Sequence, residues 1–213
     1  MRIIVLIKPE AELEESDACA VEHALGLARR RLDVQVSLLT AGSGSCVRAL
    51  RSALALGADD AVHLADVRTS PYDVLALSRV LAEAIRELGF DLVLCGVESQ
   101  TPNFSVLPAM IAVRLGIPAL CHVTHLDLNS IASPTLISVT SRSVPLAYPS
   151  FPSIAEARQK LISTRASSPC ATTQPAVTVK VRHPRPNTII KAEGDPHDAV
   201  AQLVDFLADH RFI

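Results

Sequence analysis

The run Gly42-Ser43-Gly44-Ser45 consists of residue types that can hold an anion. It stands between a strand expected over residues 34–39 and a helix expected over residues 46–56. In such a turn the peptide N–H groups and the helix N-terminus point toward one place and can bind a phosphate. The run lacks the full dinucleotide fingerprint and the lysine of a P-loop, so taken alone it also fits a simple tight turn.

Histidine and cysteine supply little further chemistry. Cys121-His122 and His125 bring metal-binding residue types together, but on a strand the side chains at 122 and 125 point to opposite faces, which disfavours a metal site. His23 and His63 lack neighbours that would make them catalytic, and the sequence shows no grouping of Ser, His and an acid. The sequence therefore presents no enzymatic constellation.

The composition disfavours several classes of partner. Lys and Arg number 20 and Asp and Glu 22, so the formal charge of −2 is too balanced for a protein that mainly binds nucleic acid or an acidic membrane. With no Trp, two Tyr and five Phe, few rings exist for base stacking. The five cysteines form no Cys-x-x-Cys pair, which favours the reducing cytoplasm. We expect neither a signal peptide nor a membrane span.

The elements that must position these residues alternate between strand and helix. Residues 3–7 form a short β-branched run typical of a strand buried on both faces. A helix capped by Asp17 is expected next, and a later helix is expected to begin at Ser70-Pro71. Further strands are expected at 34–39, 61–64, 91–96, 119–123 and within 134–151, and further helices at 46–56, 105–115 and 154–162.

Four or five such units in a row predict an α/β fold with a doubly wound, mostly parallel sheet. Ligands of such sheets bind at the carboxyl ends of the strands, here residues 7–9, 41–45 and 96–107. Residues 163–174 are mostly Ser, Thr, Ala and Pro, typical of a linker or an extended arm. We predict an α/β domain over residues 1–162 and a C-terminal part over 163–213 that docks on a partner or on that domain. This part holds a strand at 176–181 and a helix opening at Asp195-Pro196.

Six short motifs are spread in order over nearly the whole chain. They are Ile4-Val5-Leu6-Ile7-Lys8, residues 17–27, Arg51-Ser52-Ala53-Leu54-Ala55-Leu56-Gly57-Ala58-Asp59, Asp91-Leu92-Val93-Leu94-Cys95-Gly96, Tyr148-Pro149-Ser150-Phe151-Pro152-Ser153-Ile154 and Gly194-Asp195-Pro196. Together they resemble the beta subunit of electron transfer flavoproteins, including its nitrogen-fixation-associated branch.

The resemblance implies an electron carrier and not an enzyme. A beta subunit of this family pairs with an alpha subunit that holds most of a redox-active FAD. The pair carries electrons from dehydrogenases, such as acyl-CoA dehydrogenases, to a downstream acceptor. The beta subunit usually buries AMP, and in flavin-bifurcating members the same pocket holds a second FAD. The implied fold is the adenine-nucleotide-binding, Rossmann-like type, with the nucleotide bound within residues 1–162.

The resemblance also assigns site residues. The implied cofactor-binding positions are Leu6, Asp17, Ala41, Gly42, Gly96, Val97, Glu98, Ser99, Asn103, Ser105, Val106 and Leu107. The loop that docks on a dehydrogenase would carry its apolar anchor at Phe151, flanked by Tyr148 and Pro152. The alternative for Phe151 is that it packs on its own domain.

The chain departs from the family pattern where the phosphate is expected. Ser105-Val106-Leu107 replaces a polar run, and Thr101-Pro102-Asn103 replaces an acidic loop. These differences leave a second hypothesis open, a stand-alone adenine-nucleotide-binding protein that has lost electron transfer. A third, an enzyme acting on adenylate, would need a catalytic group from Lys8, Glu98 or residues 14–17.

Overall fold

The structure is a computed structural model of the 213-residue chain. It describes residues 1–65, 73–97, 105–126, 132–166 and 196–210. The chain divides into two compact units, Met1–Pro175 and Ala176–Ile213. The predicted strand at 176–181 lies outside the described residues.

The first unit contains a seven-stranded, all-parallel sheet in the order β5-β6-β4-β1-β2-β3-β7. This confirms the predicted α/β fold with a doubly wound sheet. The strands are β1 (Arg2–Leu6), β2 (Gln35–Ala41), β3 (Asp60–Ala65), β4 (Leu92–Gly96), β5 (Ala119–Val123), β6 (Thr135–Val139) and β7 (Ile162–Ala166).

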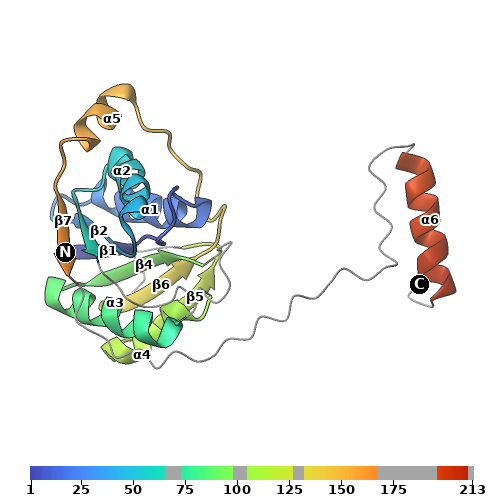
Figure 1. The fold of residues 1–213 in the computed structure, drawn as a ribbon, viewed down its shortest axis with the longest axis horizontal. Coiled ribbons are helices and arrows are strands. Elements are labelled where there is room, and N and C mark those ends of the chain that lie inside the picture. Colours follow the sequence, from blue (N-terminus) through green and yellow to red (C-terminus); the bar gives the residue numbers. More distant parts are fainter. Residues whose placement is uncertain (66–72, 98–104, 127–131, 167–195, 211–213) are drawn as a thin grey trace. The chain divides into compact units, whose positions relative to one another are not determined.

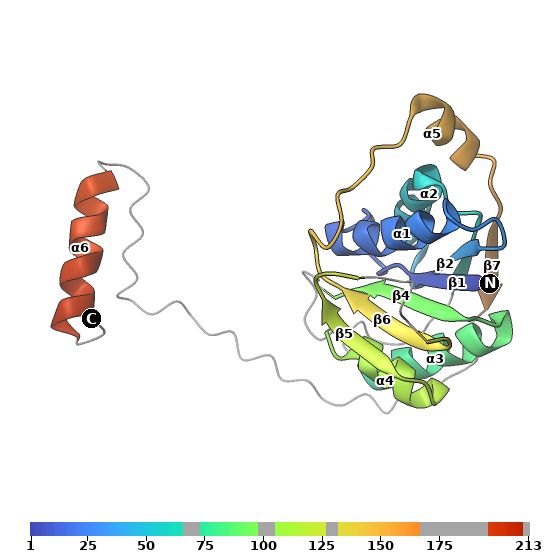
Figure 2. The same cartoon turned by 180° about the vertical axis from the view of Figure 1, so that it is seen from behind.

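Helices cover both faces of the sheet (Figures 1 and 2). α1 (Glu15–Ala28) and α2 (Val47–Leu56) lie on one face, with the short 3-10 turn η1 (Gly44–Cys46) before α2. α3 (Val74–Leu88) and α4 (Leu107–Leu115) lie on the other. Because β1 is apolar at every position, Ile3 and Val5 pack in the α1 and α2 layer while Ile4 and Leu6 pack in the α3 and α4 layer.

The order of the strands creates a switch point. From β1 the chain moves to β2 and β3 on one side, and it then crosses to β4 on the other side of β1. The carboxyl ends of β1 and β4 are therefore neighbours whose following helices, α1 and α4, leave toward opposite faces. Open α/β sheets bind their ligands in the crevice that forms at such a point.

Three local expectations are corrected. α3 begins at Val74 and is capped by Asp73, whose side chain accepts from Ala76 N; Ser70-Pro71, the expected start, lies outside the described residues. α1 begins at Glu15, so Asp17 lies in its first turn and is not its cap. Residues 163–166, expected in a linker or an extended arm, belong to the edge strand β7, which pairs with β3. The sheet therefore continues past residue 162.

Helix α5 (Phe151–Ala157) is fastened to α2 by two basic side chains. Arg51 on α2 donates from Nη1 to the carbonyl oxygens of Ala157 and Lys160, at 2.6 Å each. Lys160 donates in return to Ala58 O at 2.9 Å, beyond the end of α2. Cations at helix C-termini satisfy carbonyl groups that the helices leave unpaired. The fastening fixes the direction of α5, whose first residue is Phe151.

The second unit contains α6 (Pro196–Asp209), which confirms the predicted last helix. Val200, Leu203, Val204 and Phe206 on it are exposed apolar side chains. No helix among the described residues combines the length and the apolar character needed to cross a membrane.

We predict that Arg51→Met lowers the free energy of unfolding by about 1–3 kcal/mol, because two carbonyl groups lose a charged donor. Urea unfolding followed by far-ultraviolet circular dichroism measures this. The matched control is Arg48→Met on the same helix. Arg48 is 71% exposed and forms a 3.3 Å ion pair with exposed Glu12, so its loss is expected to cost less than about 0.5 kcal/mol. Equal losses in the two variants would contradict the proposed fastening.

Candidate functional site

The carboxyl ends of β1, β2 and β4 surround a small, mainly apolar pocket, here called the strand-end pocket, with a volume of about 30 Å³. Its lining residues come from the three strands, the loop after β1 and helices α1, α3 and α4: Leu6, Ile7, Lys8, Pro9, Asp17, Leu39, Ala41, Leu77, Leu81, Cys95, Gly96, Leu107, Pro108 and Ile111. A volume of this size holds about one water molecule. A larger ligand would therefore lie mostly above the strand ends.

A buried ion pair joins the end of β1 to the first turn of α1. The Lys8 ammonium lies 2.6 Å from Asp17 Oδ1 and 3.0 Å from Glu14 Oε2, and it donates to Ser16 Oγ at 2.9 Å. The backbone N–H of Lys8 donates to Asp17 Oδ2 at 2.8 Å. Both oxygens of Asp17 are thus bound by one residue, so the loop between β1 and α1 is closed at a fixed geometry.

The Lys8 side chain stays charged in this setting. Burial by itself lowers the pKa of Lys8, but the carboxylates of Asp17 and Glu14 outweigh burial and raise this pKa above its ordinary value of 10.5. Two carboxylates facing one ammonium leave a formal charge of −1 in the cluster. Lys8 is therefore a structural cation that its own neighbours have neutralised.

Two glycines at the pocket are required by the packing of the chain itself. A Cβ on Gly96 would lie 2.5 Å from both Asp17 Oδ1 and Ser16 Oγ, because the first turn of α1 crosses β4 at this residue. A Cβ on Gly42 would lie 2.6 Å from Pro9 Cβ. Contacts this short exclude any side chain at either position without movement of the backbone.

The peptide groups expected to hold a phosphate are partly engaged. Gly42 N donates to Leu64 O at 3.1 Å, and Val97 N donates to Val139 O at 3.0 Å. Gly42 O lies 2.9 Å from His63 Nε2 and accepts from it, which gives this buried histidine a structural role. At these two positions the backbone therefore extends the sheet instead of pointing free donors at a ligand.

The structure brings most of the sequence-predicted cofactor positions together. Those that line the strand-end pocket are Leu6, Asp17, Ala41, Gly96 and Leu107, and Gly42 and Val97 directly follow two of them in the chain. Ser105 and Val106 are exposed immediately before α4. Glu98, Ser99 and Asn103 lie outside the described residues.

The side chains that sequence reasoning missed are Lys8, as a partner of Asp17, and the apolar wall from α3 and α4. A lysine directly after a fully apolar strand, nine residues before an aspartate, was the signal for the ion pair. For Leu77, Leu81 and Ile111 the sequence offers only helix periodicity, which indicates burial without naming the cavity that is lined.

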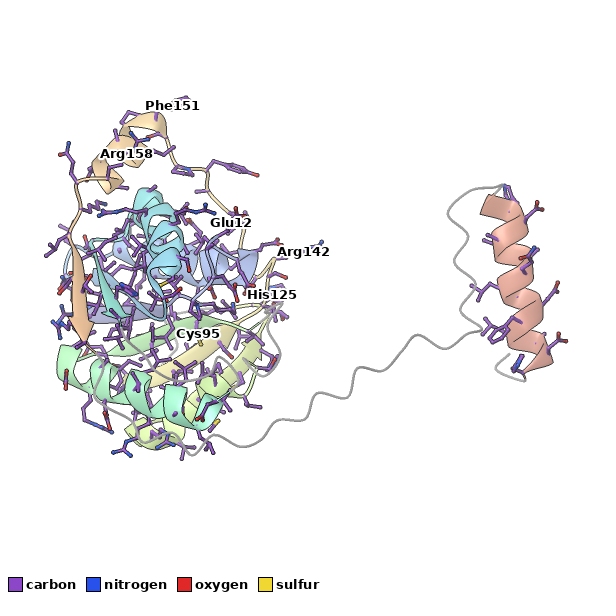
Figure 3. The ribbon with its side chains drawn as sticks, viewed as in Figure 1. Glu12, Cys95, His125, Arg142, Phe151 and Arg158 are labelled. Atoms are coloured by element: carbon purple, nitrogen blue, oxygen red, sulfur yellow. The ribbon has the colours of Figure 1, made fainter. Side chains whose placement is uncertain are left out.

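Thiols and metals add nothing to the described site. Burial raises the pKa of the Cys95 thiol, so this cysteine at the pocket is held in its unreactive protonated form (Figure 3). Among the described residues no three His, Cys, Asp or Glu side chains are placed to hold a metal ion.

The sequence-predicted docking residues lie on the surface. Phe151 is 89% exposed and Tyr148 is 95% exposed, and Pro152 is exposed beside them. Figure 3 shows Phe151 at the outer end of α5. The alternative that Phe151 packs on its own domain is wrong. Its role in docking stays a prediction.

The comparisons with known proteins agree on one family. The family model described as the electron transfer flavoprotein domain matches residues 3–141. The electron transfer flavoprotein beta subunit of Mycobacterium tuberculosis is 31% identical over 176 residues, covering 72% of this chain and 66% of that protein. The beta subunit of Megasphaera elsdenii is 36% identical over 120 residues, covering 53% of this chain and 44% of that protein. A protein named FixA from Bradyrhizobium diazoefficiens is 35% identical over 125 residues, covering 56% and 43%. The chain thus spans 66% or less of the length of these three relatives.

We predict that Lys8→Met destabilises the protein by about 3–5 kcal/mol near pH 8, because two carboxylates lose their buried counter-charge. In this variant burial holds the folded-state pKa of Asp17 above its unfolded value, so the folded variant gains protons and stability as the pH falls to about 5. In the wild type, the raised pKa of Lys8 contributes to the free energy of unfolding. This contribution is complete below pH 10.5 and is lost only as the pH rises through the folded-state pKa of Lys8. The loss should therefore shrink toward acid.

Urea unfolding at several pH values between about 5 and 8 measures this change. If Lys8→Met is unfolded near pH 8 and folds on acidification, this also shows that its loss of stability shrinks toward acid. The matched control is Lys160→Met, which removes a lysine that donates to backbone carbonyls. Its loss should not vary over this pH range. A Lys8→Met loss that stays constant with pH would contradict the assigned ion pair.

Proposed function

The chain belongs to the electron transfer flavoprotein beta-subunit family, and we propose that it acts as the beta-like subunit of an electron carrier, paired with an FAD-holding alpha subunit. The observation that carries this proposal is the strand-end pocket, which lies at the switch point of the sheet and inside the region that matches the family model. The described groups at the pocket also favour a carrier over a catalyst. Lys8 is neutralised by two carboxylates, and Cys95 is buried and protonated.

AMP is the ligand that we propose for the region above the strand-end pocket. The described lining fits the base, because Leu6, Pro9, Ala41 and Leu107 offer apolar surface to a flat ring. It fits the phosphate less well, since the cluster around Lys8 carries a formal charge of −1. The phosphate would be met by the Ser105 hydroxyl and the peptide N–H groups at the start of α4. In a flavin-bifurcating carrier, FAD would occupy the same place.

The electron donors that we propose are dehydrogenases, such as acyl-CoA dehydrogenases, which would dock on the exposed residues at the start of α5. The FAD shared with the alpha subunit would supply the redox chemistry. This chain would contribute a rigid scaffold and a docking surface. An aromatic side chain that is exposed on a firmly held helix is suited to act as an anchor, because little conformational entropy is lost on binding.

We predict that coexpression with an electron transfer flavoprotein alpha subunit yields a stable complex that contains FAD. The chain purified alone and the complex are each denatured, and the released nucleotides are identified by chromatography and absorbance. AMP from both samples, with FAD only from the complex, is the expected result. Two FAD molecules per complex would indicate the bifurcating form. Failure to form any complex would overturn the proposal, and AMP without a complex would favour the stand-alone adenine-nucleotide-binding protein.

We predict that Phe151→Ala raises the KM of a donor dehydrogenase for the complex more than about tenfold, as expected for loss of a hot-spot anchor. Because Phe151 is exposed, the free energy of unfolding should change by less than about 0.5 kcal/mol. Leu32→Ala is the matched control, since Leu32 is a fully exposed apolar side chain on the loop between α1 and β2. Equal KM values for the two variants would show that the dehydrogenase binds elsewhere.

A further inference from the structure

A second cavity lies along the later turns of α1, whereas the strand-end pocket touches its first turn. This outer cleft, of about 590 Å³, is bounded by α1, by the residues after β5 and by the residues after β6. It is lined by Glu22, His23, Gly26, Leu27, Arg29, Arg30, His125, Leu126, Ser143, Val144 and Pro145. Its volume falls in the range of about 300–1,000 Å³ that is typical of small-molecule sites.

One buried acceptor at the cleft has no donor. The Glu22 side chain is more than nine-tenths buried, and Oε1 accepts from Arg29 Nη2. Its second oxygen, Oε2, is buried without a hydrogen-bond partner among the described residues. This oxygen has almost no solvent-accessible surface, so a ligand in the cleft does not reach it, and the charge of Glu22 is balanced by Arg29.

The middle of the cleft offers a neutral polar pair. His23 Nε2 lies 3.1 Å from Ser143 Oγ, across the space between α1 and the segment after β6. Burial lowers the pKa of His23, and the nearby Glu22 carboxylate only partly opposes this effect. The ring is therefore neutral near pH 7, and the imidazole and hydroxyl can exchange hydrogen bonds with a polar ligand.

Cationic groups surround this centre. Arg29 and Arg30 directly follow the last residue of α1 and line the cleft, and Arg29 is ion-paired with Glu22. The side chains of Arg30 and His125 form no hydrogen bond or ion pair within the described part of the chain. Figure 3 shows His125 on the same side of the molecule as Arg142. The cleft thus combines a net positive charge with a neutral pair of hydrogen-bonding side chains.

We propose that the outer cleft binds a small anion that also carries hydroxyl groups, of the hydroxycarboxylate or sugar-phosphate class. The carboxylate or phosphate lies against Arg30, because a guanidinium forms paired hydrogen bonds to either group. A hydroxyl group exchanges hydrogen bonds with His23 Nε2 and Ser143 Oγ, and the apolar side chains of Leu27 and Val144 contact the carbon skeleton. The proposal is independent of electron transfer, since it uses none of the strand-end residues.

The test is isothermal titration calorimetry on the full chain with two matched pairs of probes. Malate is compared with succinate, which lacks the hydroxyl group, and glycerol 3-phosphate is compared with glycerol, which lacks the anion. The expected result is that malate or glycerol 3-phosphate binds at least about tenfold more tightly than its matched probe. If malate binds more tightly than glycerol 3-phosphate, the anionic group of the ligand is a carboxylate. In the opposite case it is a phosphate.

Variants assign the binding to the cleft. Arg30→Gln is expected to weaken the preferred probe at least about tenfold. Ser143→Ala removes the hydroxyl beside His23, and it should remove most of the preference for malate over succinate. Arg48→Gln, an exposed arginine on α2, is the control and should leave both values unchanged. Circular dichroism confirms that each variant is folded.

Three results would overturn the proposal. These are no binding of any probe at millimolar concentration, equal binding within each pair, and equal weakening by Arg30→Gln and Arg48→Gln. Two-dimensional amide NMR adds a direct location, with shifts expected at residues 22–30 and 143–145. Shifts confined to the strand ends would also reject the outer cleft.

Discussion

The buried ion pair between Lys8 and Asp17 is the contact on which the ligand-facing end of the fold depends. Its two partners are nine residues apart, yet they tie together the last turn of backbone after β1 and the first turn of α1. A buried pair of this kind is costly to desolvate, and it persists where its geometry and additional hydrogen bonds compensate. Here Ser16 and Glu14 supply those bonds. The loop that forms one wall of the strand-end pocket is consequently fixed in place.

The same contact restricts which residue can stand at the end of the neighbouring strand β4. With the first turn of α1 held against the sheet, β4 has to pass directly beneath Ser16 and Asp17, and only glycine fits at position 96. The close packing of α1 against the sheet also limits which groups at the pocket can bind a ligand. Lys8 is ion-paired with the protein's own carboxylates, and the Gly42 and Val97 N–H groups donate to carbonyl oxygens of neighbouring strands. The pocket walls are therefore suited to a flat apolar group, and the charged part of a nucleotide depends on the start of α4.

The sequence predicts the fold well because its strongest signals are local. Unbroken apolar strands such as residues 3–7, and helix periodicity ended by Gly57, Gly89 and Gly116, specify the alternation of strand and helix. The strand β7 escaped prediction because Ser163, Thr164 and Arg165 are polar, as an edge strand with solvent on one side permits. The Lys8 ion pair and the outer cleft could not be predicted, since both depend on the angle at which elements pack. The periodicity of apolar residues carries no information about that angle.

Helix α1 separates two sites of different character. Its first turn, with Ser16 and Asp17, faces the strand ends, whereas Glu22, His23 and Gly26 on the following turns face the outer cleft. The strand-end site is apolar with a net negative cluster, and the outer cleft is polar with a net positive rim. Coupling between two sites requires an element that both ligands bias between two arrangements. The first turn of α1 and its cap Glu14 are held by four contacts to Lys8 in one arrangement, so the helix acts as a rigid wall and each site can carry its own ligand chemistry.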